Sequence, residues 1–211
     1  MDRLRLMEKE IDLENSEILY NAPFTDVSLA ADWEACSGEW RLEGGWITGA
    51  CRENAGGMIY SKAGFPGDIL MDFYGRTVPP CAHDLNFTWN AQGWDFAKND
   101  ASISYIAGLN GWWENKLGIE RYPDCCFRAA TPLFELEAGR VYRIQAGSIA
   151  GHCFIFIDGK LGLEVLDPAP VDSMLYSRVG FGAYCSHVQF KDLTVRKPRW
   201  KPLTMAYTPS F

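Results

Sequence analysis

The residues best suited to do chemistry are carboxylates and arginines that stand beside aromatic and apolar stretches. Glu120 and Arg121 follow each other in an apolar run, and Arg128 comes just after the adjacent pair Cys125 and Cys126. An arginine and a carboxylate near aromatic rings can hold a uronate or a polyhydroxylated ring through charge-assisted hydrogen bonds. The same groups are equally suited to an internal ion pair.

Histidines are the second source of acid–base chemistry. His83 follows Pro79 and Pro80 in a predicted loop that leads into a polar-faced strand, where an imidazole can act as a base or a metal ligand. His152 is expected to be exposed in a hairpin, and a structural role is expected for His187. Glu120, His83 and Asp72 are therefore the candidate catalytic acids and bases.

Two predicted strands carry an unusual polar face. Residues 84–90 alternate apolar and polar side chains, and residues 70–76 do the same. The polar faces contain Asp, Asn, Thr, Tyr and Arg but no Lys or Glu, which favours a surface that hydrogen bonds to hydroxyl groups. An ordinary solvated sheet face is the alternative. Asp72, Arg76 and Asn86 are the residues predicted to bind a ligand here.

A glycine-bounded loop contains Trp112 and Trp113 side by side, followed by Glu114 and Asn115. Two adjacent indole rings in a polar segment do not both fit easily into a core, so one can serve as an exposed stacking platform. The alternative is that the pair closes one end of the fold, since tryptophan is mostly buried.

Metal and cofactor motifs are absent from the sequence. It contains no His-x-His, Cys-x-x-Cys or His-Glu-x-x-His spacing, so neither a metal nor a cofactor is predicted. It also lacks a Gly-x-Ser-x-Gly elbow, a phosphate-binding loop and a dinucleotide fingerprint. The seven cysteines have no metal-ligand spacing, and they favour reduced, mostly buried thiols in the cytoplasm.

Short apolar runs separated by Gly, Pro, Asn and Asp clusters must position these residues. About a dozen strands are predicted, with tight hairpins at Gly44–Gly45 and Asp158–Gly159. Almost no helix is expected, apart from a short amphipathic helix over residues 1–10. The pattern predicts an all-β fold of two packed antiparallel sheets.

Length and charge limit the classes of function. The 211 residues fit one domain, 1–211, with a short N-terminal segment 1–16 and an extended, aromatic C-terminal tail 197–211 through which a homodimer can form. A net charge of -7 argues against nucleic-acid binding. No signal-peptide core and no stretch of about 18 apolar residues is present, so neither secretion nor a membrane span is expected.

From Ile18 onward the order of features resembles the concanavalin A-like lectin and glucanase superfamily. The phrases that carry the resemblance are 18–24, 65–73, 138–144, 156–160, 178–182 and 188–195. The sequence is most similar to the YesU-like family of galectin-like proteins, through 18–24, 65–73 and Cys126-Phe127-Arg128. The resemblance implies a jelly-roll sandwich and a role in polysaccharide utilisation. The Glu-x-Asp-x-x-Glu strand of family-16-type glucanases is absent, which disfavours that mechanism.

Two classes of function follow from these observations. The first is a carbohydrate-binding or carbohydrate-processing protein that acts on oligosaccharides inside the cell, with Trp112 or Trp113 stacking on the sugar. If it is an enzyme, a hydrolase or lyase, Arg121 or Arg128 would stabilise developing charge. The alternative is a non-catalytic structural or assembly domain.

Overall fold

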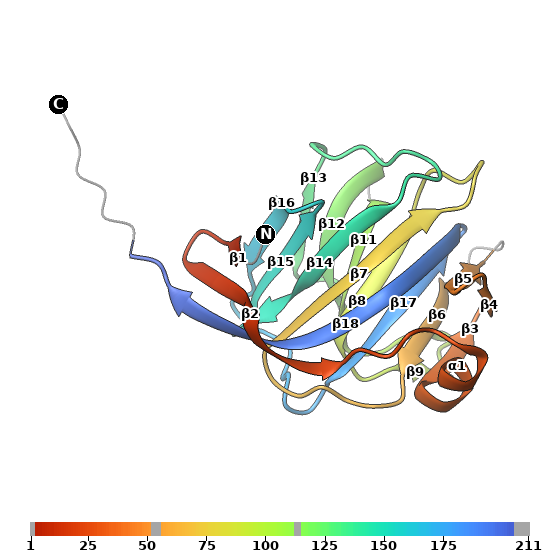
Figure 1. Ribbon diagram of the computed structural model, residues 1–211, viewed down its shortest axis with the longest axis horizontal. Helices are drawn as coiled ribbons and strands as arrows, with labels where there is room; N and C mark the ends of the chain where they lie inside the picture. The colour runs from red at the N-terminus through yellow and green to blue at the C-terminus, as the bar shows by residue number, and fades with distance from the viewer. Residues whose placement is uncertain (1–2, 52–55, 112–114, 205–211) are drawn as a thin grey trace.

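The alternating apolar pattern forms two antiparallel sheets that pack face to face (Figure 1). The computed structural model describes residues 3–51, 56–111 and 115–204. Sheet A has the strand order β1-β2-β18-β7-β14-β15-β16, with β5 paired to β18 and β4 paired to β5. Sheet B has the order β13-β12-β11-β8-β17-β6-β3, and β9 and β10 form a separate small hairpin. The predicted all-β jelly-roll sandwich is confirmed.

The elements have the following bounds: β1 Arg3–Arg5, β2 Lys9–Tyr20, α1 Asp26–Asp32, β3 Trp33–Ser37, β4 Glu39–Glu43, β5 Trp46–Ala50, β6 Gly56–Ser61, β7 Ile69–Thr77, β8 Leu85–Ala91, β9 Trp94–Asp95, β10 Asp100–Ala101, β11 Ser104–Gly111, β12 Lys116–Tyr122, β13 Arg128–Thr131, β14 Tyr142–Ile149, β15 His152–Ile157, β16 Lys160–Leu166, β17 Arg178–Tyr184 and β18 His187–Pro202. Both predicted hairpin turns form, with φ of 57° and 81° at Gly44 and Gly45 and of 51° and 77° at Asp158 and Gly159. Two successive positive φ angles are typical of the turn that matches the twist of paired strands.

The core lies between the two sheets and is rich in aromatic rings. Phe181 of β17 stacks on Phe190 of β18 with ring centroids 4.2 Å apart, and Phe73 of β7 meets Phe87 of β8 edge-on at 5.3 Å. Each pair joins one sheet to the other, and such pairs contribute about 0.5–1.5 kcal/mol beyond the area they bury. The alternation on β7 and β8 therefore places their polar faces on the outside of the sandwich, on opposite sheets.

The N-terminal segment is a β-hairpin, so the expected helix over residues 1–10 is wrong. Leu4 of β1 pairs with Ile11 of β2, and their side chains pack with Leu70 and Phe154 on the outer face of sheet A. Leu4 and Leu6 alternate with arginine and methionine at the period of a strand, and the apolar patch on sheet A selects that conformation.

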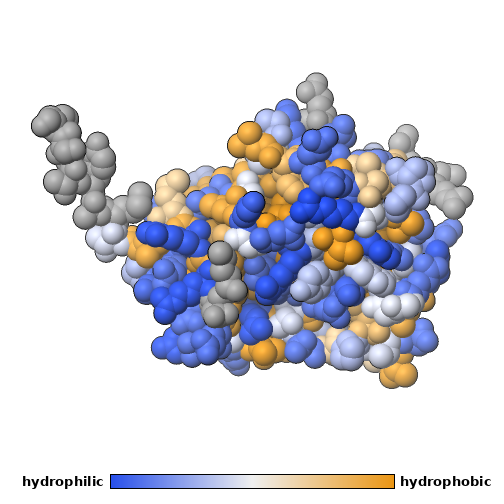
Figure 2. Space-filling view, turned by 45° about the horizontal axis from the view of Figure 1, so that its top comes forward, coloured by the Kyte–Doolittle hydropathy of each residue, from blue (hydrophilic) through white to orange (hydrophobic). Residues whose placement is uncertain are grey.

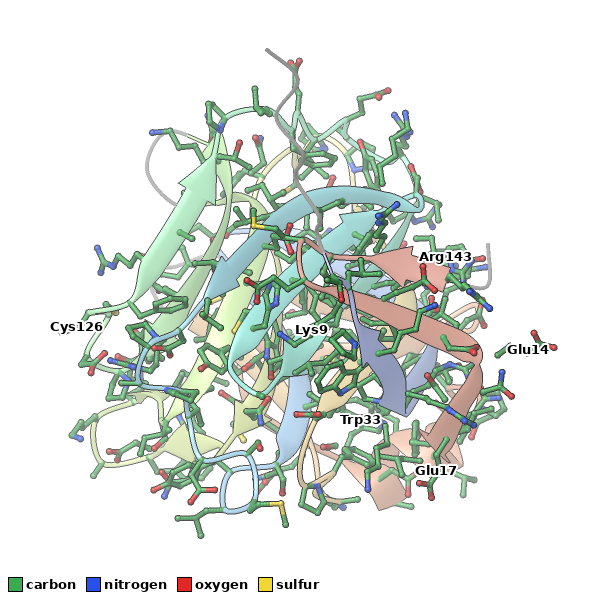
Figure 3. The ribbon with its side chains drawn as sticks, turned by 90° about the vertical axis from the view of Figure 1, so that its left-hand side faces the viewer. Lys9, Glu14, Glu17, Trp33, Cys126 and Arg143 are labelled. Carbon is green, nitrogen blue, oxygen red and sulfur yellow. The ribbon has the colours of Figure 1, made fainter. Side chains whose placement is uncertain are left out.

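A polar cluster holds this hairpin over sheet A. Lys9 donates to Nδ1 of His152 at 3.2 Å, and Nε2 of His152 lies 2.9 Å from Glu164. Lys9 lies near the middle of the view in Figure 3, over the strands of sheet A. His152 is buried rather than exposed, which corrects the sequence expectation. The hairpin covers the imidazole, and nothing in the local sequence signals this cover.

Residues 197–202 form part of sheet A. Strand β18 continues through Pro202, and Arg199 pairs with Asp12 while Trp200 pairs with Ile11. The aromatic segment therefore begins as a strand packed on its own chain, and residues 205–211 lie outside the described residues. A homodimer through this segment stays a prediction.

Candidate functional site

A hollow of about 460 Å³ lies on the outer face of sheet B. Its floor is made by the polar face of β8 and by side chains of β11, β12, β6 and β17, and the β9–β10 hairpin forms one wall. The described residues that line it include His83, Asp84, Asn86, Trp94, Asp100, Ile106, Asn110, Gly111, Glu120, Tyr122 and Tyr184. Three of these carry carboxyl groups, and none is a lysine or an arginine.

Asp84 is held at one end of this hollow by its backbone. The residue has a φ of 63°, its N–H donates to the carbonyl of Asn110 at 3.3 Å, and its own carbonyl accepts from Ser186 Oγ at 3.0 Å. The side chain lies over Gly111, where an added Cβ would stand 2.3 Å from Asp84 Oδ1. The glycine therefore makes room for this carboxyl.

The environment of Asp84 favours its protonated form. Burial raises the pKa of the Asp84 carboxyl to about 7, and the negative charge of Glu120 acts in the same direction. A hydrogen bond with Asn86 opposes these two effects. Asn86 itself is buried, and its Oδ1 has no hydrogen-bond partner among the described residues.

Glu120 projects from the middle of β12 into the same hollow. Its side chain is only 6% exposed, and its Oε2 lies 3.3 Å from Nε of Arg128. Glu120 and Arg128 are directly opposite in the β12–β13 register. Within the described ranges, no hydrogen-bond partner meets Oε2. Oε2 therefore has an ion-pair contact but no hydrogen bond, and a buried acceptor in that state commonly marks a position that a ligand or water fills.

The wall of the hollow combines an indole and a phenol. Tyr122 donates to both carboxylate oxygens of Asp100 at 3.1 Å, which ties β12 to the β9–β10 hairpin. Burial raises the pKa of Tyr122, so the phenol keeps its proton. Trp94 packs against the small cluster formed by Met58, Tyr60 and Ala91, and it lines the hollow beside them.

A second hollow of about 750 Å³ adjoins the first at the end of the sandwich. Both are lined by His83, Asn110, Asn115 and Cys185, so the two form one continuous groove. The second is lined further by Glu39, Arg41, Pro79, Pro80, Ser186 and His187. His187 Nε2 is buried and has no hydrogen-bond partner among the described residues.

The predicted site residues divide between the two outer faces. Glu120, His83 and Asn86 line the hollow on sheet B. Asp72 and Arg76 instead project from β7 on sheet A, so they cannot join these residues in one site. The reason is topological, because the polar faces of β7 and β8 belong to opposite layers.

On sheet A, Asp72 and Arg76 are engaged by their own neighbours. Arg143 donates to the two oxygens of Asp72 at 2.9 and 2.6 Å, and Gln145 donates at 3.0 Å. Arg76 donates to Gln189 at 2.8 Å. Arg143 and Cys126, which precedes β13 of sheet B, lie on opposite sides of the molecule in Figure 3.

Arg121 points away from the hollow, because neighbouring residues of a strand face opposite sides. Its Nη1 lies 3.1 Å from Oδ1 of Asp167, a carboxylate that also accepts from Tyr105 Oη at 2.8 Å. The internal ion pair, one of the two expectations for this residue, is therefore the arrangement found. Arg128 forms its ion pair with Glu120 and stands at the edge of the site. Trp112 and Trp113 lie outside the described residues.

The adjacent cysteines are thiols, and Cys126 is exposed rather than buried as expected. Among the described residues, no group of three or more His, Cys, Asp or Glu is arranged to hold a metal ion. Of the helices described, none has the length and hydropathy to cross a membrane.

Sequence reasoning missed Trp94, Asp100 and Tyr122 as site residues, and it placed Asp84 on the polar face of residues 84–90 without naming it as a site residue. Tyr122 could have been predicted from the sequence, since it stands two positions after Glu120 and therefore lies on the same face of the strand. The short β9–β10 hairpin has no comparable signal, because its placement over sheet B depends on contacts distant in sequence.

Comparison with known proteins gives relatives by structure alone. No family model matches the sequence, and no curated protein matches it. A protein of unknown function with a galectin-like fold from Bacillus subtilis superposes with a TM-score of 0.65 at 14% identity, covering 86% of this chain and 96% of that one. The carbohydrate-binding module CBM66 from Bacillus subtilis superposes at 0.60 and 13% identity, with coverages of 78% and 95%.

A structure described as a native glycosidic hydrolase superposes with a TM-score of 0.56 at 10% identity, covering 84% of this chain and 94% of that chain. At sequence identities this low, the structural similarity establishes the fold alone. The concanavalin-like, galectin-like sandwich expected from the sequence is confirmed.

Proposed function

We propose that this chain binds a neutral oligosaccharide in the groove on the outer face of sheet B. The observation that carries the proposal is the pair of buried oxygen acceptors, Asn86 Oδ1 and Glu120 Oε2, that face the hollow without hydrogen-bond partners among the described residues. Sugar hydroxyl groups donate the hydrogen bonds that such acceptors lack. The similar fold of a carbohydrate-binding module and of a glycosidic hydrolase supports this class of ligand.

The shape of the groove supports a sugar ring and a chain of more than one residue. The rings of Trp94 and Tyr122 provide flat apolar surface beside the polar floor, which is the combination that binds the C–H and O–H faces of a sugar. The second hollow continues from the first through His83 and Asn110. An oligosaccharide can extend along this path, whereas a monosaccharide would occupy one hollow only.

The charge of the first hollow favours a neutral ligand over a uronate. Asp100 and Glu120 bring negative charge to it, and no lysine or arginine is among the described residues that line it. Arg121 is bound to Asp167, and the charge of Arg128 is offset by Glu120. A ligand carboxylate would meet repulsion and lose its hydration without a compensating cation.

We place this activity in polysaccharide utilisation inside the cell. The thiols of Cys81, Cys125, Cys126 and Cys153 are compatible with a reducing compartment.

The test is a thermal-shift screen followed by calorimetry. Partial hydrolysates of xylan, arabinan, galactan and β-glucan would be compared with oligogalacturonates. We expect a neutral oligosaccharide to bind with micromolar to millimolar affinity, about 4–8 kcal/mol. The oligogalacturonates should not bind.

Two substitutions and one control locate the site. Asn86→Ala and Trp94→Ala should each weaken binding about tenfold, as expected for a lost hydrogen bond or stacking contact of about 1.4 kcal/mol. Arg76→Ala, on the opposite sheet, should leave the affinity unchanged. A tenfold loss of affinity in Arg76→Ala, together with an unchanged affinity in Asn86→Ala, would place the site on sheet A instead. An absence of binding across the whole panel would remove the carbohydrate proposal.

A further inference from the structure

Two carboxyl groups face the hollow from opposite ends. Gly108 of β11 pairs with both Asn86 and Gly118, and Ile106 pairs with Glu120. Asp84 and Glu120 therefore stand on strands separated by β11, four residue positions apart along the strands. Four positions span roughly 14 Å along the strands and two strand spacings add about 10 Å across them, and the Asp84 side chain, which lies over Gly111, reaches across the strands toward β12.

The two carboxyl groups have different environments. Glu120 lies 3.3 Å from the Arg128 guanidinium, whereas no ion pair is found for Asp84 among the described residues. Burial raises the pKa of Asp84 to about 7, so this acid still carries its proton when ordinary carboxyl groups are ionised. A buried acid and an ion-paired carboxylate in one sugar-sized hollow are the arrangement that general acid–base catalysis requires.

Other titratable groups lie around Asp84. Glu120 and Tyr122 face it from β12, Asp100 from β10, and His83 and Cys185 from the adjoining loops. Tyr122 and Asp100 are engaged with each other. Burial raises the pKa of the Cys185 thiol, and Asp84 adds to that shift, so the thiol is a weak acid at this position.

We infer that Asp84 and Glu120 are a general acid and general base that hydrolyse a glycosidic bond of the neutral oligosaccharide, an inference that rests on the proposed function. The ionised Glu120 takes a proton from a water molecule as the water oxygen bonds to the anomeric carbon. The bond from that carbon to the glycosidic oxygen breaks, its electron pair stays on the oxygen, and Asp84 supplies the proton to it. One water is consumed, two sugar chains are released, and proton exchange with solvent restores both groups.

The separation of the two groups favours direct attack by water. Inverting glycosidases hold their carboxyl groups about 6.5–9.5 Å apart to admit that water, whereas retaining enzymes bring them to about 5 Å. Because the Asp84 side chain lies over Gly111, it does not shorten the offset of roughly 14 Å along the strands, and this offset keeps the two carboxyl groups farther apart than a retaining pair. The first product is therefore expected to have the inverted anomeric configuration.

The experiment measures binding and turnover on the same sample. The full chain would be incubated with partial hydrolysates of xylan, arabinan, galactan and β-glucan, with products followed by mass spectrometry and the anomer by proton NMR. We expect new reducing ends from the hydrolysate that also gives a thermal shift. Binding with no product after long incubation would overturn this inference and leave the proposed function intact. Neither binding nor product would overturn both.

Matched amide variants assign the two roles. Glu120→Gln and Asp84→Asn should each lower the rate 10²–10⁴-fold while the oligosaccharide still raises the melting temperature. Glu17→Gln, an exposed carboxylate on β2 of sheet A, is the control and should keep the wild-type rate. Rates within threefold of wild type in both site variants would remove the pair from the mechanism.

Two further measurements separate catalysis from a structural role. On 4-nitrophenyl glycosides, whose leaving group needs no proton, Asp84→Asn should regain most of its lost rate. With Glu120→Ala, added azide should restore turnover and yield a glycosyl azide of inverted configuration. A merely structural role would give neither rescue, and an absence of both would refute the assigned roles.

Discussion

Replacing Asp84 by asparagine should stabilise the folded protein at alkaline pH. Asparagine tolerates the left-handed φ of 63° at this position, so the change adds no backbone strain. It keeps the shape of the side chain and removes only its ability to ionise. Any change in stability with pH therefore reports the charge of one buried group.

The sign and size follow from the pKa of Asp84, which burial and the Glu120 charge raise from 3.8 to about 7. Between those values the folded chain binds more protons than the unfolded chain, so stability falls as pH rises through the window. About three pKa units, at about 1.4 kcal/mol each, give an upper bound of about 4 kcal/mol. Water entering the open hollow reduces this, and we expect about 2–4 kcal/mol at pH 8.

The assay is thermal unfolding of wild type and Asp84→Asn at steps from pH 4 to pH 9. For a chain of this size the expected gain corresponds to roughly 5–15 °C in Tm at pH 8. The difference in Tm between the two proteins should grow from about pH 4, and it should level off above pH 7. A difference that stays constant with pH, or a variant less stable at pH 8, would show that folding does not raise the pKa of Asp84 and would refute the reasoning.

Three other outcomes follow from the structure. Arg121→Met should lower the free energy of unfolding by about 3 kcal/mol in urea titrations, because Asp167 is left buried with its charge unpaired; oligosaccharide affinity should not change, and the reverse result would return Arg121 to the site. Burial and Lys9 lower the pKa of His152, so the wild type should lose folding stability as pH falls below about 6.5 and the imidazole must take up a proton. His152→Gln should flatten that slope in thermal unfolding, and an unchanged slope would contradict the assignment. Gly111→Ala should displace the Asp84 side chain and lower the rate of turnover at least tenfold, which corresponds to about 1.4 kcal/mol in activation free energy. The Tm of the variant should be measured on the same sample to confirm that it is folded.

The surface alone would not have located the site. Figure 2 shows hydrophobic residues that reach the surface in patches among hydrophilic ones on the face in view. The hollow is instead defined by buried polar groups that lack partners, which are Asn86 and Glu120. Such a group is a more informative sign of function than an exposed apolar residue.

Most strands, and the side of each that is buried, can be predicted from the amino-acid sequence. Alternation every second residue sends Phe73 and Phe87 to the core and Asp72 and Asn86 outward, because neighbouring side chains of a strand point to opposite faces. Glycine pairs and Asp-Gly predicted the two hairpins for a similarly local reason. Residues 1–10 misled, because their short apolar spacing fits a helix as well as a strand.

Which outward faces belong to one site depends on how the strands pair in the folded chain. Asp72 and Asn86 look alike in sequence, yet strand order places them on opposite sheets and brings Glu120 and Asp84 to one hollow. Arg121 follows Glu120 directly, but the alternation of the strand commits it to Asp167, which is 46 residues away in the chain. The strand pattern is set by neighbours in sequence, whereas the site is set by pairings between distant segments, which a local pattern does not record.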